Sequence, residues 1–218
     1  MRTFSREEAR HVYNRIGARQ DSQAFYEDHA ASLIARHGEL GTARRVFEFG
    51  CGTGRFALRL LSEHLSPDAT YRAVDISPTM VGLAQGRLAP FASRAEVALT
   101  DGAPPDEEPS ESYDRFISTY VFDLLSEDDI EGVLQEAHRI LQPGALLCLS
   151  SLSPGSSLAP RLVAGLWSAL HRLSPRLVAG CRPLELLGRL SSSQWRIRHH
   201  LQIAPFALPS DVVIAERL

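Results

Sequence analysis

The chain contains no lysine: all 23 of its basic residues are arginines, in a sequence of 218 residues. This absence excludes a P-loop, because that phosphate-binding loop requires a lysine that reaches the phosphates. Acidic residues outnumber basic ones, and a net charge of −3 argues against a protein that binds nucleic acid through a basic face. Nucleic acid is therefore not expected among its partners.

Long apolar runs and cysteines are also scarce. No run approaches the roughly 20 apolar residues that cross a bilayer, and residues 1–10 lack the apolar core of a secretion signal. Cys51, Cys148 and Cys181 lack metal-site spacing, so free thiols and no bound metal are expected. These features predict a cytoplasmic protein without a transmembrane segment. The length and the 44% hydrophobic content fit a single domain over residues 1–218.

The most informative stretch is Val46–Phe56, which reads VFEFGCGTGRF. Its pattern predicts an apolar strand, a turn with three glycines in five residues, and then a helix. Glycine is required where φ is positive or where a ligand lies against the main chain, so the turn is expected to line a pocket. A dinucleotide fingerprint fits less well, because Arg55 stands where its third glycine would be and Glu48 has no role in it.

The sequence EFGCGTG resembles the first motif of the class I S-adenosylmethionine (SAM)-dependent methyltransferases, and the chain is similar to their small-molecule type, the ubiquinone and menaquinone C-methyltransferases. The resemblance covers roughly residues 46–152. It implies an α/β fold, a Rossmann-like three-layer sandwich whose seven-stranded, mostly parallel sheet has an antiparallel last strand and helices on both faces. It also implies SAM as the cofactor, S-adenosylhomocysteine (SAH) as the product, and methyl transfer to a small acceptor.

Acidic residues at the ends of the expected strands suggest roles in holding that cofactor. Glu48 is expected to receive the α-ammonium group, and Asp75 to accept the ribose hydroxyls, as the corresponding acid does in dinucleotide folds. Asp101 resembles the acid that reads the adenine, although an aspartate that caps its own turn is an alternative. Ile76 and Met80 could enclose the adenine ring or simply belong to the core. The full set of expected cofactor-binding residues is Glu48, Gly50, Cys51, Gly52, Gly54, Asp75, Ile76, Met80, Asp101, Gly102 and Thr119.

The later segments complete the expected sheet. A buried strand ends at residues 118–120, and Glu127–Leu141 has helical spacing with Ser126 as its cap. A fifth strand follows at Ala145–Leu152, and Gln194–Ile203 with Asp211–Leu218 reads as a hairpin.

The residues before Val46 are expected to form a helical cap over residues 1–45. Methyl transfer by in-line displacement depends mainly on alignment of the two reactants and needs little acid–base chemistry. The candidate positioning groups are Tyr13, Tyr26 and Tyr120, with His29 as a base for hydroxyl or carbon acceptors. For Tyr13 and Tyr26 the alternative is that they pack the cap against the sheet.

Residues 153–193 are expected to be a helical insertion before the last two strands. The hexapeptide PRLVAG at 160–165 recurs at 175–180, which predicts two short helices, and residues 151–200 hold seven arginines against the single acid Glu185. Either the insertion only packs against the domain, or it is a lid or docking face for an amphipathic or anionic substrate. Its arginines also allow peripheral membrane contact.

The expected acceptor is a small, apolar or amphipathic molecule. The fourth strand ends in STYV and lacks the Asn-Pro-Pro-Tyr type of signature associated with methylation of nucleobases and amides in the resembled superfamily. A non-catalytic SAM-binding or partner-binding module on the same fold is the alternative. Aminopropyl transfer from decarboxylated SAM is disfavoured by Glu48, because this carboxylate is assigned to the α-ammonium group of the cofactor.

Overall fold

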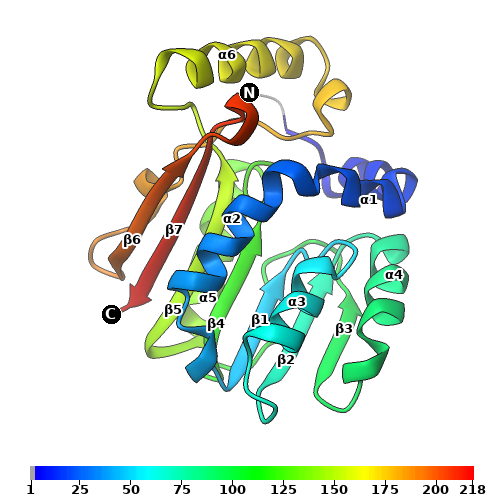
Figure 1. Ribbon diagram of the computed structural model, residues 1–218, viewed down its shortest axis with the longest axis vertical. Coiled ribbons are helices and arrows are strands. Elements are labelled where there is room, and N and C mark those ends of the chain that lie inside the picture. Colours follow the sequence, from blue (N-terminus) through cyan, green and yellow to red (C-terminus); the bar gives the residue numbers. More distant parts are fainter. Residues whose placement is uncertain (1–2) are drawn as a thin grey trace.

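A seven-stranded sheet forms the middle layer of the molecule, with strand order β3-β2-β1-β4-β5-β7-β6 (Figure 1). The computed structural model describes residues 3–218. The first five strands run parallel, whereas β7 is antiparallel to both of its neighbours, β5 and β6. The strands are β1 (Arg45–Phe49), β2 (Thr70–Asp75), β3 (Ala95–Leu99), β4 (Tyr113–Thr119), β5 (Leu141–Leu152), β6 (Trp195–Ile203) and β7 (Ser210–Arg217). The predicted fold class is confirmed.

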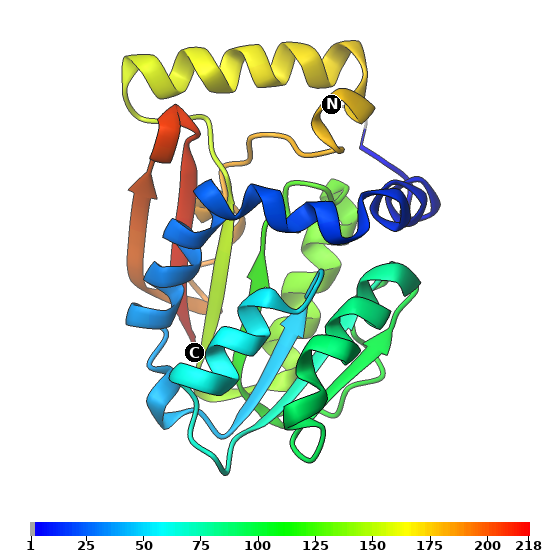
Figure 2. The ribbon, with the colours of Figure 1, turned by 45° about the vertical axis from the view of Figure 1, so that its right-hand side comes forward.

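Helices cover both faces of the sheet and one end of it (Figures 1 and 2). The α-helices are α1 (Arg6–Ile16), α2 (Ala24–His37), α3 (Arg55–Glu63), α4 (Pro78–Leu88), α5 (Glu127–Ile140) and α6 (Leu158–Leu173). The 3-10 turns are η1 (Gly17–Gln23), η2 (Leu40–Thr42), η3 (Ala89–Phe91), η4 (Pro175–Val178), η5 (Leu187–Arg189) and η6 (Pro205–Ala207). Among residues 3–218, no helix combines the length and apolarity that a bilayer span requires.

Two apolar cores explain why Val46, Phe47 and Phe49 of β1 are all apolar although they point to opposite faces. Val46 joins a buried cluster with α2, α3 and α4 on one face, whereas Phe47 and Phe49 join a cluster with α5 on the other. A parallel strand covered on both faces needs apolar residues at successive positions rather than at alternate ones. The strand is thus fixed in the centre of the sheet, and its carboxyl end delivers the glycine turn.

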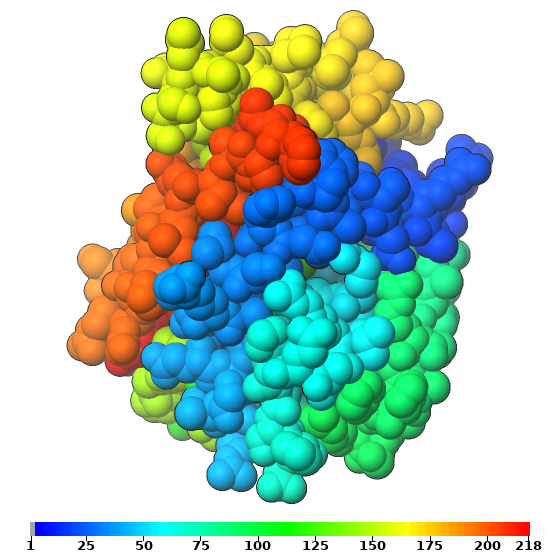
Figure 3. All heavy atoms as spheres, in the orientation of Figure 1, coloured from blue at the N-terminus to red at the C-terminus, as the bar shows by residue number. Residues whose placement is uncertain are grey.

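The N-terminal residues form the expected helical segment and cross one face of the molecule. Figure 3 shows them (blue) between α6 (yellow) and the helices α3 and α4 (cyan and green). Ser5 caps α1 with a full capping box, because its Oγ accepts from Glu8 N while the Glu8 carboxyl accepts from Ser5 N. Gly17, with φ of +48°, then turns the chain from α1 into η1.

The insertion differs from the prediction of two short helices. The first PRLVAG copy lies inside the 16-residue helix α6, whereas the second forms the four-residue turn η4. After η4, Ala179 and Gly180 adopt φ values of +52° and +86°, and Gly180 lies directly against the Phe4 ring. Identical hexapeptides fold differently here, so contacts with the rest of the chain determine the structure of the second copy. The expectation of two short helices is wrong.

Candidate functional site

A cavity opens where the strand order reverses, at the carboxyl ends of β1, β2 and β4. Ligand sites of open α/β sheets lie at such switch points, because the loops from neighbouring strands diverge there. The N-terminal segment closes the cavity from the other side, through residues such as Phe4, Tyr13 and Gln20. The site is therefore built from elements far apart in the sequence.

The glycine turn forms one wall of the cavity, and its glycines have different tasks. Gly52 has φ of +54°, and a Cβ built on it would meet no atom within 4 Å, so this residue leaves space for a ligand. A Cβ on Gly54 would instead lie 2.9 Å from the Ala84 Cβ, which makes Gly54 a contact between α3 and α4. Gly54 lies outside the cavity lining, whereas Gly50, Cys51 and Gly52 belong to it.

Asp75 joins the glycine turn to the following loop. Its Oδ2 accepts a 2.8 Å hydrogen bond from Gly52 N and its Oδ1 a 2.9 Å bond from Ser77 N, and the side chain lines the cavity. Burial raises the pKa of Asp75, and the backbone N–H donors oppose that rise. Each carboxyl oxygen retains a second lone pair, so Asp75 can fix the turn and still accept from a ligand hydroxyl.

Glu48 lies at the base of the cavity and is only 1% exposed. The Tyr71 hydroxyl donates a 2.9 Å hydrogen bond to its Oε2. Burial raises the pKa of Glu48 to about 7, and the Tyr71 hydrogen bond opposes the shift. A buried carboxyl of this kind is ready to pair with a ligand cation, because such a cation would supply the favourable charge that the protein lacks there.

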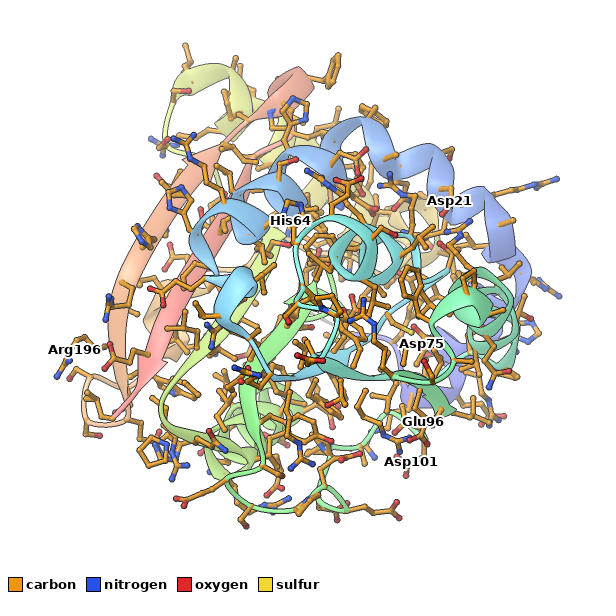
Figure 4. The ribbon with its side chains drawn as sticks, turned by 60° about the horizontal axis from the view of Figure 1, so that its bottom comes forward. Asp21, His64, Asp75, Glu96, Asp101 and Arg196 are labelled. Carbon is orange, nitrogen blue, oxygen red and sulfur yellow. The ribbon has the colours of Figure 1, made fainter. Side chains whose placement is uncertain are left out.

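The other expected cofactor residues divide into two groups. Those that line the cavity are Ile76, Met80, Gly102 and Thr119. Asp101 does not line it: the side chain is exposed, and its Oδ1 accepts from Ala103 N at 2.7 Å (Figure 4). This is the turn-capping alternative. β3 ends at Leu99, opposite Asp75, so Asp101 lies two residues beyond the strand and outside the switch point.

The four catalytic candidates are also separated by the structure. Tyr13 and Tyr120 line the cavity. Tyr26 lies outside the lining, with its ring 5.4 Å from that of Tyr120, and it donates a 3.0 Å hydrogen bond to Gln23 Oε1. His29 is exposed on α2 and also lies outside the lining. The geometry favours the packing alternative for Tyr26 and gives no support to His29 as a base.

Tyr120 is held in an unusual backbone conformation at the tip of β4. Its φ is +55°, which costs on the order of 1 kcal/mol or more for a residue with a side chain. The hydroxyl donates a 3.0 Å hydrogen bond to Ser210 Oγ on β7. Strain of this kind persists only where the surroundings fix it, and here it turns the ring into the cavity wall.

The N-terminal segment contributes acids that sequence patterns did not single out. Asp21 accepts from Thr53 Oγ1 at 2.6 Å and pairs with Arg87 at 2.8 Å, which ties η1 to the glycine turn and to α4. Glu27 lines the cavity and accepts from Gln20 Nε2 at 3.1 Å. Burial raises the pKa of Glu27 to about 7. No motif marks these residues, because only the turn at η1 brings them over the cavity.

Asp123 is a further buried acid, outside the cavity lining. It is 0% exposed, and neither of its carboxyl oxygens has a hydrogen-bond partner among residues 3–218. Burial, together with the nearby Asp123 carboxyl, raises the pKa values of Tyr13 and Cys181, whose side chains lie 4.0 Å apart. Burial likewise raises the pKa of Asp123 to about 7. The folded chain therefore favours the protonated form of this carboxyl.

We expect Asp123→Asn to flatten the pH dependence of stability. An ordinary aspartate has a pKa of about 3.9, so the folded chain holds the extra proton between roughly pH 4 and 7 and loses stability as pH rises through that window. At pH 8 the loss is on the order of 4 kcal/mol at most, and the amide removes it. Urea unfolding at pH 5 and pH 8 measures the difference.

The exposed variant Asp68→Asn is the matched control and should retain the wild-type pH dependence. Glu27 and Glu48 have raised pKa values of the same sign, so some dependence remains in Asp123→Asn. An unchanged slope in Asp123→Asn would show that this carboxyl is not the buried proton-holding group.

Comparisons with known proteins agree with the geometry. Residues 46–144 match the family model described as a methyltransferase domain. The chain is 30% identical over 139 residues to a malonyl acyl-carrier protein O-methyltransferase of Paenibacillus sp. (strain JDR-2). This alignment covers 59% of this chain and 46% of that protein. It is 27% identical over 175 residues to the demethylmenaquinone methyltransferase of Chlamydia caviae, covering 79% of this chain and 67% of that one.

A solved structure shows the same fold over the whole length. The crystal structure of the cyclase SpnF matches with a TM-score of 0.75 and 14% identity, and the match covers 100% of this chain and 98% of that one. At that identity the likeness concerns the fold alone. The chain spans less than half the length of the Paenibacillus relative, so that protein's activity does not transfer directly.

Proposed function

We propose that the chain is a class I SAM-dependent methyltransferase, as its match to a methyltransferase domain and its relatives support, and that it transfers the methyl group of SAM to a small, apolar or amphipathic acceptor by in-line displacement. The observation that carries the proposal is one cavity lined both by the glycine turn with Asp75 and by Tyr13 and Tyr120. The glycine turn and Asp75 suit the methyl donor, and the two tyrosines suit the methyl acceptor.

The residues present fit SAM as the cofactor. We assign its α-ammonium to Glu48, a buried carboxyl without a cationic partner in the described chain, and its ribose hydroxyls to Asp75. Ile76 and Met80 are proposed to enclose the adenine. When bound, this group supplies a methyl on a positively charged sulfonium, a charge that is lost as the methyl leaves.

The protein's own contribution is alignment and exclusion of water. Alignment of two reactants supplies much of the barrier reduction in such displacements, and a water-poor site favours a reaction in which charge disappears. Tyr13 and Tyr120 would orient the acceptor, and the N-terminal segment covers the cavity. For a hydroxyl acceptor, Glu27 is better placed than His29 to take the proton, since it lines the cavity and its pKa is about 7.

The acceptor class and cellular location are part of the proposal. The two relatives act, by their names, on a malonyl acyl-carrier protein and on demethylmenaquinone. A small apolar or amphipathic acceptor is compatible with the apolar side chains in the lining of the cavity, among them Phe4, Val121 and Leu124. Three free, buried cysteines fit a reducing compartment, so we place the protein in the cytoplasm. Residues 1–45 and 153–193 are proposed as the cap and the insertion of one domain.

The proposal is tested by calorimetry with SAM and SAH, followed by a screen for transfer of a labelled methyl group to phenols, quinones and acyl thioesters. We expect both nucleosides to bind and label to appear in one of these classes. Absence of binding would overturn the proposal. Binding without transfer to any class would favour the alternative of a non-catalytic SAM-binding module.

Affinity for SAH should weaken as pH falls through about 7. Only the ionised Glu48 carboxylate attracts the ammonium, and with a pKa of about 7 the ionised fraction drops about tenfold between pH 8 and pH 6. Titration calorimetry at the two pH values should therefore show about tenfold weaker binding at pH 6. Glu48→Gln should bind weakly at both, and an equal pH slope in that variant would assign the dependence to another group.

A further inference from the structure

The outward side of α6 exposes leucines where a surface helix normally presents polar residues. Leu158, Leu162 and Leu166 follow one another at intervals of four and are 77%, 68% and 64% exposed. Leu173 and Leu177 continue the stripe at 78% and 60%. We call these five leucines, together with Leu170, the α6 face. Single exposed leucines are ordinary, but a contiguous apolar strip of this kind marks an interaction surface.

The opposite side of α6 anchors the helix to the domain. Ala164 and His171 are buried, and Trp167 Nε1 donates a 3.0 Å hydrogen bond to Cys181 O. The His171 ring nitrogen Nε2 lies 3.2 Å from Gly180 O. Figures 1 and 2 show α6 as the outermost layer at its end of the molecule. The helix is therefore held in place with its leucines directed outward.

The charged side chains that the segment of α6 and η4 itself carries are of one sign. Between Pro154 and Gly180 the only charged residue types are the arginines Arg161, Arg172 and Arg176, and no aspartate or glutamate occurs. All three arginines are exposed. The exposed Arg196 on β6 pairs with Glu216, whereas none of these three arginines forms an ion pair within residues 3–218.

An apolar strip on a segment whose charged side chains are all arginines fits the surface of an anionic lipid bilayer. Helices that lie in the interface bury their apolar side at the level of the acyl boundary, while arginines contact lipid phosphates. A second copy of this chain fits less well, because it would bring two sets of unpaired arginines together. We propose that the α6 face docks the protein on membranes that contain anionic lipid.

The docking face is joined to the cavity. Trp167 holds Cys181, whose Sγ lies 4.0 Å from the hydroxyl of Tyr13, a residue of the cavity lining. Phe4, also in the lining, packs against Gly180 just after η4. A membrane bound at α6 would thus lie beside the Tyr13 end of the cavity, where an amphipathic acceptor could enter. This last step rests on the proposed function, but the docking itself does not.

Co-sedimentation of the full chain with vesicles tests the docking. Wild type should bind vesicles of phosphatidylcholine mixed with phosphatidylglycerol more tightly than vesicles of phosphatidylcholine alone, and added salt should weaken the binding. Removing the charge of Arg161, Arg172 and Arg176 together by Arg→Gln should weaken binding about a hundredfold, at about 1 kcal/mol for each arginine. Leu162→Gln with Leu166→Gln should weaken it by about tenfold or more.

Matched controls remove the same groups elsewhere. Arg→Gln at Arg15, Arg19 and Arg44 removes three exposed arginines, and Leu99→Gln alters a leucine that is 55% exposed on β3. Both controls should bind vesicles like wild type. SAH binding should be unchanged in every variant, which separates this test from the proposed function. Failure of wild type to bind anionic vesicles, equal losses in the controls, or a dimer in sedimentation velocity that Leu162→Gln with Leu166→Gln abolishes would each overturn the proposal.

Discussion

Gly52→Arg should abolish binding of SAM and SAH, by at least about a hundredfold, and leave a folded chain. The substituted side chain would start from a position with no atom within 4 Å and extend into the cavity, so it would occupy the ligand's space without displacing the protein. The φ of +54° adds a strain of about 1–2 kcal/mol, which a domain of ordinary stability tolerates. Calorimetry with SAH measures the affinity, and thermal unfolding shows whether the fold persists.

Gly144→Arg is the matched control for this substitution. Gly144 has φ of +79°, also has no atom within 4 Å of a built Cβ, and lies exposed at the start of β5, outside the cavity lining. It should lose about the same stability and retain full affinity. If Gly52→Arg bound SAH like the control, the glycine turn would not be the ligand site and the assignment of the cavity to the cofactor would fail.

The strand, turn and helix around Gly52 could be predicted because their determinants are local. An apolar run, three glycines and a helical pattern occupy adjacent positions, and β1 and α3 form at those positions. The same holds for α5. Its cap, Ser126, and its apolar spacing predict the helix to within one residue of its observed end. Local signals of this kind place Glu48 and Asp75 in the site without knowledge of the remaining chain.

The cavity wall supplied by the N-terminal segment could not be predicted in the same way. Gln20, Asp21 and Glu27 belong to no motif, and they reach the cavity only because the chain turns at Gly17 and is fixed by the pair of Asp21 with Arg87. His29 and Glu27 are two residues apart, yet one is exposed and the other lines the cavity. The rotation of α2 about its axis decides between them, and that rotation is set by packing.

The end of β3 illustrates how a small shift changes an assignment. The sequence VALTDG predicts a strand that continues to its acid, but pairing with β2 ends at Leu99 opposite Asp75. Two further residues carry Asp101 into an exposed turn, and Thr100 and Gly102 line the cavity instead. Strand boundaries depend on the neighbouring strand, which the local sequence does not specify.

Asp75→Ala should weaken SAH binding about a hundredfold or more. The substitution removes the acceptor proposed for the ribose and leaves Gly52 N and Ser77 N without their partner, which loosens the turn at the same time. Loss of these hydrogen bonds at a buried position costs roughly 1–3 kcal/mol for each group left unpaired. Asp75→Asn keeps one acceptor oxygen and should lose less, so calorimetry on the two variants separates the acceptor from the charge.

Asp101→Ala tests whether Asp101, like Asp75, contributes to cofactor binding as the sequence predicted for both acids. Asp75 is the last residue of β2 and is 8% exposed in the cavity wall, whereas Asp101 lies beyond the end of β3, is exposed and accepts a hydrogen bond from Ala103 N. Asp101→Ala should therefore bind SAH within about twofold of wild type, because an exposed turn cap contributes chiefly to the local loop. A loss as large as that of Asp75→Ala would mean that ligand binding draws the loop after β3 inward, and that Asp101 contacts the adenine as its sequence position first indicated.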